Sequence, residues 1–451
     1  MDMTEVLRFQ KAFSLPRYTE DSVLLLPVSG GADSTYLAIL LHRLFPDAPF
    51  QMIFTDTGAE EPEIYVVLDK LEQYLGKPIT RIKPKLDLFQ LIEKQGGFLP
   101  SASQRWCTRE LKLVSFRQWI AQFAGRQKFM FIGIRADEHE RVAFSINEVE
   151  TVLPFVDLGL SREDIFQGLR ETIGVPRFYQ RRSRSGCSTC PFQRRSELVG
   201  LLQDKPEEFA RGMFYEKLTA SDAARHDPAL PLWNDTGLGA NWLSLPRPAG
   251  TQAVSGTKAK ADDLFGNRGI FVGGEFFMDA MPGMEPFVWH QRVISYSQSL
   301  AGLKRQLDDR YRHLLSTSEV FDMEPEDVRR NVKFAIWYVE LPGEVFDPAG
   351  PTGESYTWLK GTSYRQLRHI VQWVTRALQA EQLRQEAAFE PTSLLSVEYE
   401  WSESAKTAIS EVREETGQVI DSMWYEPKEA PPTDLTEEEE LSLLPCPMCH
   451  I

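Results

Sequence analysis

The sequence predicts an α/β fold with a doubly wound parallel sheet over roughly the first 200 residues, and two observations indicate it. Strand-like and helix-like segments alternate from residue 23 to about residue 173. The expected strands are also continuous apolar runs, which is typical of parallel strands that helices cover on both faces. The pattern changes after about residue 200, where we expect a mostly helical C-terminal region.

The elements of this first region follow from apolar spacing and turn residues. Residues 23–28 are almost entirely aliphatic and predict a buried strand, and a glycine turn separates it from a helix with leucines at helical spacing. The sequence Ser161-Arg162-Glu163-Asp164 resembles a capping box and predicts the start of the last helix. The other expected strands are 51–55, 79–82 and 129–134, and the other expected helices cover residues near 64–75, 88–92 and 108–123.

Three further parts are expected after this first domain, which we place at residues 1–200. Residues 201–284 are rich in Pro, Gly, Asn and Trp, which predicts an irregular insertion or linker. Residues 285–425 contain helical patterns around 300–314 and 367–378 and are expected to form a mostly helical domain. Residues 426–451 combine an acidic, proline-bearing linker with a Cys-Pro-Met-Cys tail.

Composition and charge exclude several classes of protein. The 451 residues are 42% hydrophobic and 25% charged, as in soluble globular proteins, and the formal charge of −15 argues against a surface that is basic throughout. No apolar run approaches the roughly 20 residues that a membrane span needs, and the first residues lack the layout of a secretion signal. We therefore expect a cytoplasmic protein without membrane contact, whose five cysteines are not a disulfide framework.

A glycine-containing loop stands between the first expected strand and the first expected helix. Its two glycines let the backbone turn tightly and present N–H groups to phosphate oxygens, and the helix start adds its dipole. An aspartate here can cap the helix or orient a Mg²⁺ ion. Because the loop has no lysine, it is not the GxxxxGK[ST] loop of kinase-like NTPases. The predicted nucleotide-binding residues of the loop are Ser29, Gly30, Gly31, Asp33 and Ser34.

Polar residues after other strands are expected to meet the same ligand, because open α/β sheets bind ligands at the carboxyl ends of their strands. Asp56 can hold a ribose hydroxyl or Mg²⁺, or it can make a turn or a helix cap. Gly133 ends the fourth expected strand. Arg135 and Arg141 suit bidentate phosphate contacts, or they form ion pairs with acidic neighbours. Lys112 is either a phosphate ligand or a surface residue.

Five short motifs follow one another within residues 20–200: SGGADS (29–34), FTDTG (54–58), RWCTRELK (105–112), GIRADEHER (133–141) and PFVD with GCSTC (154–190). In this order they resemble the phosphoadenylylsulfate (PAPS) reductase family of the PP-loop, or adenine nucleotide alpha-hydrolase-like, superfamily. The resemblance implies a HUP-like sheet domain that binds ATP or PAPS, with Mg²⁺ beside the phosphates. It implies four catalytic residues, which are Asp33, Cys107, Lys112 and Arg135.

The cysteines are the predicted ligands of a metal centre. Cys187 and Cys190 have metal-ligand spacing, and in iron–sulfur members of the resembled family a residue at the position of Cys107 joins them. The resemblance therefore implies a [4Fe–4S] cluster, although Trp106 stands where those members have another cysteine and leaves the fourth ligand open. Unmetallated thiols are one alternative. The other is a Zn²⁺ site with the ligands Cys187, Cys190, Cys446 and Cys449.

Arginines gather around the CxxC turn in a chain that is otherwise acidic. They form either a landing patch for a nucleic-acid backbone or a solvated face. The long C-terminal half leaves room for protein partners. The arginines of this Arg177–Arg195 patch are Arg177, Arg181, Arg182, Arg184, Arg194 and Arg195.

The motifs and the resemblance together predict an ATP pyrophosphatase-type sulfurtransferase. It would adenylate an acceptor and deliver sulfur from the iron–sulfur centre. Residues 186–202 look most like the PAPS-reductase-like subunit of DNA phosphorothioation systems, which favours nucleic acid as the acceptor. One alternative is a sulfonucleotide reductase that acts on PAPS or adenylylsulfate. Another is a non-catalytic nucleotide-sensing module of a defence or phage system.

Overall fold

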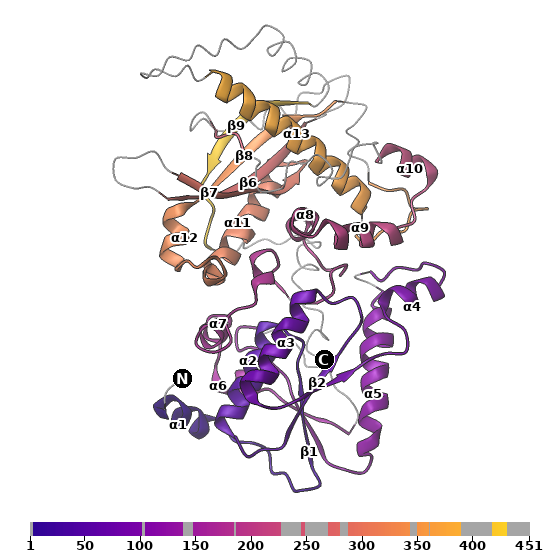
Figure 1. Cartoon of the computed structure of the whole chain (residues 1–451), viewed down its shortest axis with the longest axis vertical. Helices are drawn as coiled ribbons and strands as arrows, with labels where there is room; N and C mark the ends of the chain where they lie inside the picture. The colour runs from indigo at the N-terminus through magenta and orange to yellow at the C-terminus, as the bar shows by residue number, and fades with distance from the viewer. Residues whose placement is uncertain are drawn as a thin grey trace. The chain divides into compact units, whose positions relative to one another are not determined.

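The structure is a computed structural model, and Figure 1 shows its helices and strands. The chain divides into two compact units, and the change from the first to the second falls between Gln193 and Arg194. The first unit also takes in residues 316–324, and the second holds the rest of the described chain. The structure describes residues 3–101, 104–138, 148–184, 186–226, 245–248, 269–279, 287–342, 350–359, 361–388 and 417–430.

A parallel sheet of five strands forms the centre of the first unit, in the order β3-β2-β1-β4-β5. β1 pairs with β2 on one side and with β4 on the other, so the strand order reverses at β1. This is the doubly wound α/β arrangement that the alternating segments predicted, and the prediction is confirmed. The strands are β1 (Val23–Pro27), β2 (Phe50–Thr55), β3 (Ile79–Ile82), β4 (Lys128–Phe131) and β5 (Glu150–Val152).

Helices cover both faces of this sheet, because successive side chains of each strand point to opposite faces. Leu24 and Leu26 pack with apolar residues of α1, α2, α3 and α7, whereas Val23 and Leu25 pack with those of α5. Figure 1 shows α2 and α3 on one side of β1 and α5 on the other. The described helices are α1 (Met3–Ala12), α2 (Ala32–Leu44), α3 (Pro62–Leu75), α4 (Leu88–Lys94), the π-helix η1 (Thr108–Leu113), α5 (Val114–Ile120), α6 (Pro154–Leu158), α7 (Arg162–Arg170), and the 3-10 turns η2 (Ala121–Phe123), η3 (Arg177–Gln180) and η7 (Ser318–Phe321).

The second unit combines helices with an antiparallel sheet of four strands in the order β7-β6-β8-β9. The helical patterns at 300–314 and 367–378 correspond to α11 and α13, but the sheet was not predicted. No helix in the described part of the chain is both long and apolar enough to cross a membrane. The elements are α8 (Arg195–Asp204), α9 (Pro206–Tyr215), α10 (Ala220–Arg225), β6 (Gly269–Asp279), β7 (Phe287–Ser297), α11 (Leu300–Ser316), α12 (Pro325–Asn331), β8 (Val332–Glu340), α13 (Tyr364–Ala388) and β9 (Gln418–Tyr425).

The central strands of this sheet escaped prediction because they are buried on both faces. Nine consecutive residues of β6, from Gly269, are buried, and six consecutive residues of β8, from Phe334, are buried. A strand buried on both faces has no apolar–polar alternation, and without the alternating strand and helix segments of residues 23–173 a continuous apolar run cannot be told from a buried helix by periodicity alone. Residues 269–279 therefore belong to a sheet, although the sequence predicted an irregular segment there.

A buried ion pair joins β6 to α11 in the second unit. The Arg310 Nε and Nη2 atoms donate to the two oxygens of Glu275 at 2.8 and 2.9 Å. Arg292 lies 3.5 Å from the same carboxylate. Burial alone would raise the pKa of Glu275, but Arg310, His290 and Arg292 hold it well below its ordinary value. The carboxylate is therefore charged within the core and depends on its cationic partners.

A second buried carboxyl caps the long helix α13 of the same unit. Glu216, which follows α9, accepts hydrogen bonds from the backbone N–H groups of Tyr364 at 2.8 Å and Trp358 at 3.3 Å. Burial raises the pKa of Glu216 to about 8, and the backbone hydrogen bonds act in the opposite direction. The side chain thus satisfies an N–H group of the first turn of α13 that has no partner within the helix.

Candidate functional site

The loop between β1 and α2 is held closed by its own serines. The Ser29 N–H donates to Ser34 Oγ at 2.9 Å, and the two hydroxyl oxygens lie 3.1 Å apart. Gly30 has a φ of +71°, and a Cβ there would lie 2.8 Å from Ile64 Cγ2 of α3. A side chain is excluded at Gly30 both by backbone conformation and by space. The hydrogen bonds between Ser29 and Ser34 therefore fix the conformation of the loop. Gly31, the residue after Gly30, is the N-cap of α2.

The loop lies where the strand order reverses, next to the residues that follow β4. A Cβ at Gly133 would lie 3.2 Å from the backbone carbonyl carbon of Asp33, so this glycine allows the two segments to approach. Loops that leave neighbouring strands toward opposite faces open a crevice at such a reversal, and ligands of open α/β sheets bind there. The structure thereby brings together Asp33 and Gly133, as the sequence predicted.

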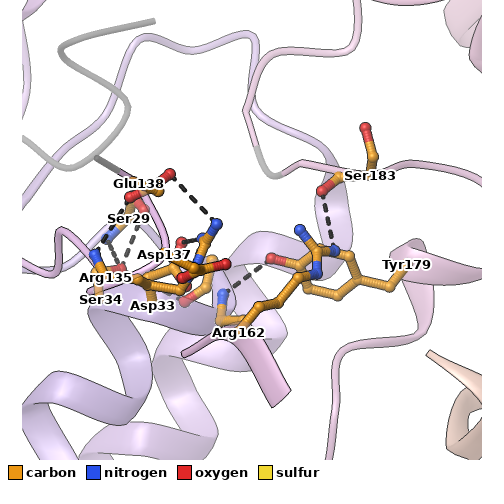
Figure 2. Close-up of polar contacts among 11 residues, drawn as sticks. Ser29, Asp33, Ser34, Arg135, Asp137, Glu138, Arg162, Tyr179 and Ser183 are labelled. Atoms are coloured by element: carbon orange, nitrogen blue, oxygen red, sulfur yellow. Dashed lines mark hydrogen bonds and ion pairs between the residues drawn. The ribbon is translucent and has the colours of Figure 1, made fainter. Parts of the chain in front are cut away.

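Arg135 is surrounded by carboxylates. Its Nη1 atom lies 3.1 Å from Asp33 Oδ2, its Nε atom 2.9 Å from Asp137 Oδ1, and its Nη2 atom 3.4 Å from Glu138 Oε1. Figure 2 shows this cluster beside the loop serines. Burial would lower the pKa of Arg135, but Asp33, Glu138 and Asp137 raise it above its ordinary value. Ion pairing, the alternative to a phosphate contact, is therefore what Arg135 does in this structure. Arg141 lies outside the described residues.

Two further residues of this cluster were missed by the sequence analysis. Tyr179, in η3, accepts a hydrogen bond from the backbone N–H of Ala32, the first residue of α2, at 2.9 Å. Arg162, the first residue of α7, lies over the rings of Phe166 and Tyr179, with its Cζ 4.9 and 6.0 Å from their centroids. One local signal was available for Arg162. A basic residue in the first turn of a helix opposes the helix dipole and suggests another reason for its presence.

Asp56, after β2, organises a turn. Its Oδ1 atom accepts hydrogen bonds from the Gly58 N–H at 2.9 Å and from the Tyr65 hydroxyl at 2.7 Å. Lys83 approaches its Oδ2 atom at 4.0 Å. The turn alternative therefore describes Asp56 here, and a ribose or Mg²⁺ contact stays a prediction.

The CxxC turn packs against the residues after β2. Cys187 forms an isolated antiparallel bridge with Glu60, and its Sγ lies 3.4 Å from Thr57 Oγ1 and 3.7 Å from a Glu60 carboxylate oxygen. Burial and the Glu60 charge raise the pKa of the Cys187 thiol well above its ordinary value, while Lys112 acts against them. Lys112, in the π-helix η1, thus lies near this thiol. π-helical turns occur frequently at functional sites.

The three cysteines of the iron–sulfur hypothesis are half-buried thiols without disulfides. Among the described residues, no group of three or more His, Cys, Asp or Glu side chains is placed to hold a metal ion. Cys107, Cys187 and Cys190 therefore do not form such a group in this structure. The iron–sulfur cluster stays a prediction. Cys446 and Cys449 of the zinc alternative lie outside the described residues.

Two members of the Arg177–Arg195 patch are internal. Arg181 Nη2 and Arg182 Nη1 each contact one oxygen of Glu61 at 2.5 Å, and all three side chains are buried. Buried side chains that pair with Glu61 are not available to bind a nucleic-acid backbone, so the prediction that Arg181 and Arg182 belong to the patch is wrong. Arg177 is exposed and Arg184 is half-buried in the first unit. Arg194 and Arg195 begin the second unit, where Arg194 approaches Asp309 at 3.5 Å.

The glycine loop after β1, its place at the strand-order reversal and the helix behind it are arranged as in α/β nucleotide-binding domains of the PP-loop type. Residues 23–154 match the family model of the phosphoadenosine phosphosulfate reductase domain. The match supports the PAPS reductase family, and with it the PP-loop superfamily, for this part of the chain.

Individual proteins are similar to part of this chain. An uncharacterized protein of Escherichia phage 186 is 27% identical over an alignment of 281 residues that covers 47% of this chain and 82% of that protein. An uncharacterized protein of Methanocaldococcus jannaschii is 24% identical over 230 residues, 49% of this chain and 44% of that protein. The crystal structure of a PAPS reductase from Candida auris, a phosphate complex, is 14% identical with a TM-score of 0.29 and covers 38% of this chain and 79% of that one.

Proposed function

We propose that the first unit binds Mg²⁺-ATP at the Ser29–Ser34 loop and cleaves it between the α- and β-phosphates, as a PP-loop ATP pyrophosphatase in sulfur transfer. The observation that carries the proposal is the charge around Asp33. Three carboxylates, those of Asp33, Asp137 and Glu138, surround Arg135, and Arg162 is the second cation of the cluster. These five side chains carry one negative charge in excess, so a polyphosphate needs a cation to bind beside them.

A Mg²⁺ ion fits this requirement. Mg²⁺ in nucleotide sites is held by one or two carboxylates together with substrate phosphates rather than by a full set of protein ligands. Asp33, whose carboxylate is partly exposed beside the loop, would supply the protein ligand. The ion, when bound, would neutralise phosphate charge. A sulfonucleotide reductase would instead need a sulfate pocket and a nucleophilic thiol that reaches it, and we therefore propose ATP rather than PAPS as the nucleotide.

The reaction we propose has two steps. An acceptor oxygen attacks the α-phosphorus of ATP, the bond between the α-phosphorus and the bridging oxygen breaks, and pyrophosphate leaves with the electron pair. The loop N–H groups stabilise that leaving charge. A sulfur nucleophile then displaces AMP from the acceptor. This second step rests on the family resemblance, and we assign none of it to an iron–sulfur cluster because the three thiols do not form a ligand group. Nucleic acid is the acceptor class we propose, with support in this unit from Arg177 and Arg184.

Calorimetry on the full-length chain tests the nucleotide. We expect ATP to bind more tightly with Mg²⁺ than with EDTA, and more tightly than PAPS. Gly30→Ala should abolish binding, because its Cβ would meet Ile64. Gly76→Ala is the matched control: Gly76 also has a positive φ, of +61°, but a Cβ there meets nothing within 4 Å.

A product assay separates the two enzyme classes. Mg²⁺-dependent release of pyrophosphate from ATP, in the presence of candidate acceptors, supports the proposal. In the sulfonucleotide reductase alternative, the nucleophile would be a thiol of the Cys-Pro-Met-Cys tail. Thioredoxin-dependent release of sulfite from PAPS, lost in Cys449→Ser, would therefore establish that enzyme instead.

A further inference from the structure

The two arginines beside the loop differ in how their charges are compensated. Arg135 contacts three carboxylates within 4 Å. Arg162, by contrast, has no ion-pair partner among the residues that the structure describes. An incoming anion competes with three directly paired carboxylates for Arg135, whereas Asp33 and Asp137 act on Arg162 only through their charge and without an ion pair among the described residues. On charge alone, Arg162 is the arginine that is able to take up a phosphate.

Aromatic rings and one weak hydrogen bond hold Arg162 in place. The guanidinium lies over Phe166 and Tyr179, and Nη2 donates to the Ser183 carbonyl oxygen at 3.4 Å. Its Nε atom is buried, and no hydrogen-bond partner for it lies within the described residues. Stacking fixes the plane of a guanidinium and leaves the N–H groups at its edge for a ligand. Figure 2 shows Arg162 beside Tyr179 and close to Asp33.

Tyr179 connects this arginine to the loop. Its hydroxyl accepts the N–H of Ala32, a group at the start of α2 that is suited to a phosphate oxygen. Burial and the charge of Asp33 raise the pKa of Tyr179 to about 12, so the hydroxyl is neutral at physiological pH. An oxygen that takes over this N–H replaces the hydroxyl and lies near the guanidinium stacked on the same ring.

We propose that Arg162 binds the phosphates that the loop holds, beyond the α-phosphate of the nucleotide, and that Tyr179 occupies the Ala32 N–H until they arrive. Arg135 then has a different role, which is to position Asp33. This inference rests on the proposed function and adds to it the residue that recognises the pyrophosphate portion of ATP.

The electrostatics of Arg162 agree with a ligand site. Burial lowers the pKa of Arg162 from its ordinary value and the charge of Arg135 acts in the same direction, while Tyr179, Asp33 and Asp137 act upward. A buried charge whose compensation is incomplete destabilises the ligand-free protein. Replacing Arg162 should therefore leave the stability of the ligand-free protein unchanged or raise it, whereas replacing a purely structural arginine would lower it.

The test is calorimetry of the full-length chain with Mg²⁺-ATP, AMP and inorganic pyrophosphate. Arg162→Ala should weaken Mg²⁺-ATP and pyrophosphate by about tenfold to a hundredfold, the range of a hydrogen bond to a charged group. AMP should change by less than about threefold, since it lacks the phosphates in question. Arg43→Ala is the matched control, because Arg43 lies at the other end of α2 and also stacks on a tyrosine, Tyr74.

Two further variants keep the test decisive if Arg162→Ala fails to fold. Arg162→Lys keeps the charge but loses the stacked plane and should weaken pyrophosphate by a smaller factor. Tyr179→Phe keeps the ring and releases the Ala32 N–H, and should bind pyrophosphate as tightly as wild type or more tightly.

Several results would overturn the inference while wild type still binds Mg²⁺-ATP: unchanged pyrophosphate affinity in the Arg162 variants, equal losses for AMP and ATP, or a loss in Tyr179→Phe. A wild-type chain that binds no ATP would instead refute the proposed function.

Discussion

The charge of Asp33 makes Mg²⁺ dependence a quantitative test of the site. Asp33→Asn removes one negative charge beside the phosphates, and its amide oxygen still accepts a hydrogen bond from Arg135, which now contacts Asp33 at 3.1 Å. The loop and its glycines are untouched. With one charge removed, the five-residue cluster becomes neutral, and we expect ATP to bind without Mg²⁺.

The magnitude follows from Coulomb's law. Two unit charges about 6 Å apart at an effective dielectric constant of about 20 to 40 interact by roughly 1.4–2.8 kcal/mol. The partial exposure of the Asp33 carboxylate favours the lower half of this range. In EDTA, Asp33→Asn should therefore bind ATP about tenfold more tightly than wild type. In Mg²⁺ this advantage should vanish or reverse, because the variant has lost a metal ligand.

The assay is calorimetric titration of ATP into wild type and variant, each in Mg²⁺ and in EDTA. The informative quantity is the ratio of the two dissociation constants for each protein, which should shrink in Asp33→Asn. Asp137→Asn is the control, since Asp137 contacts the same arginine but is more exposed, and its effect should be smaller. A ratio that is the same in wild type and Asp33→Asn would refute the charge argument and with it the proposed place of Mg²⁺.

Three further predictions concern the rest of the molecule. Arg310→Met should destabilise the second unit by about 3 kcal/mol in urea unfolding, because it leaves the Glu275 carboxylate buried without its main partner. The double variant with Glu275→Leu should recover most of the lost stability, and additive losses from the two substitutions would contradict this reasoning. The pKa of Glu216 is raised from 4.5 to about 8 in the folded chain, so its contribution to stability is complete below pH 4.5 and is lost as the pH rises through 8; Glu216→Gln should flatten this dependence, and an unaltered slope would count against it. In the metal-free protein, Glu60→Gln should speed the alkylation of Cys187 by iodoacetamide, because the neighbouring charge that raises the pKa of the thiol is gone. Peptide mass spectrometry measures the rate, and an unchanged rate would show that burial alone controls the reactivity of the thiol.

The sequence alone was sufficient for the features that depend on neighbouring residues. The loop at Ser29–Ser34 was predictable because a strand, a glycine turn and a helix follow one another within a few residues. The parallel sheet was predictable because strands covered on both faces are continuous apolar runs between helical segments. The place of Gly133 beside the loop followed from the rule that the carboxyl ends of parallel strands meet at one edge.

The tertiary structure decided which charges meet, because ion pairs join residues far apart in the chain and leave no local pattern. Arginines near the CxxC turn suggested a surface, yet Arg181 and Arg182 turn inward to a glutamate that follows β2. Arg135 suited phosphate by its motif, yet three carboxylates already surround it. Arg162 looked like an ordinary first-turn residue. Only the folding of α7 and η3 against the start of α2 places it beside the loop without an ion pair to any described residue, since the burial and pairing of a charge are set by the whole fold.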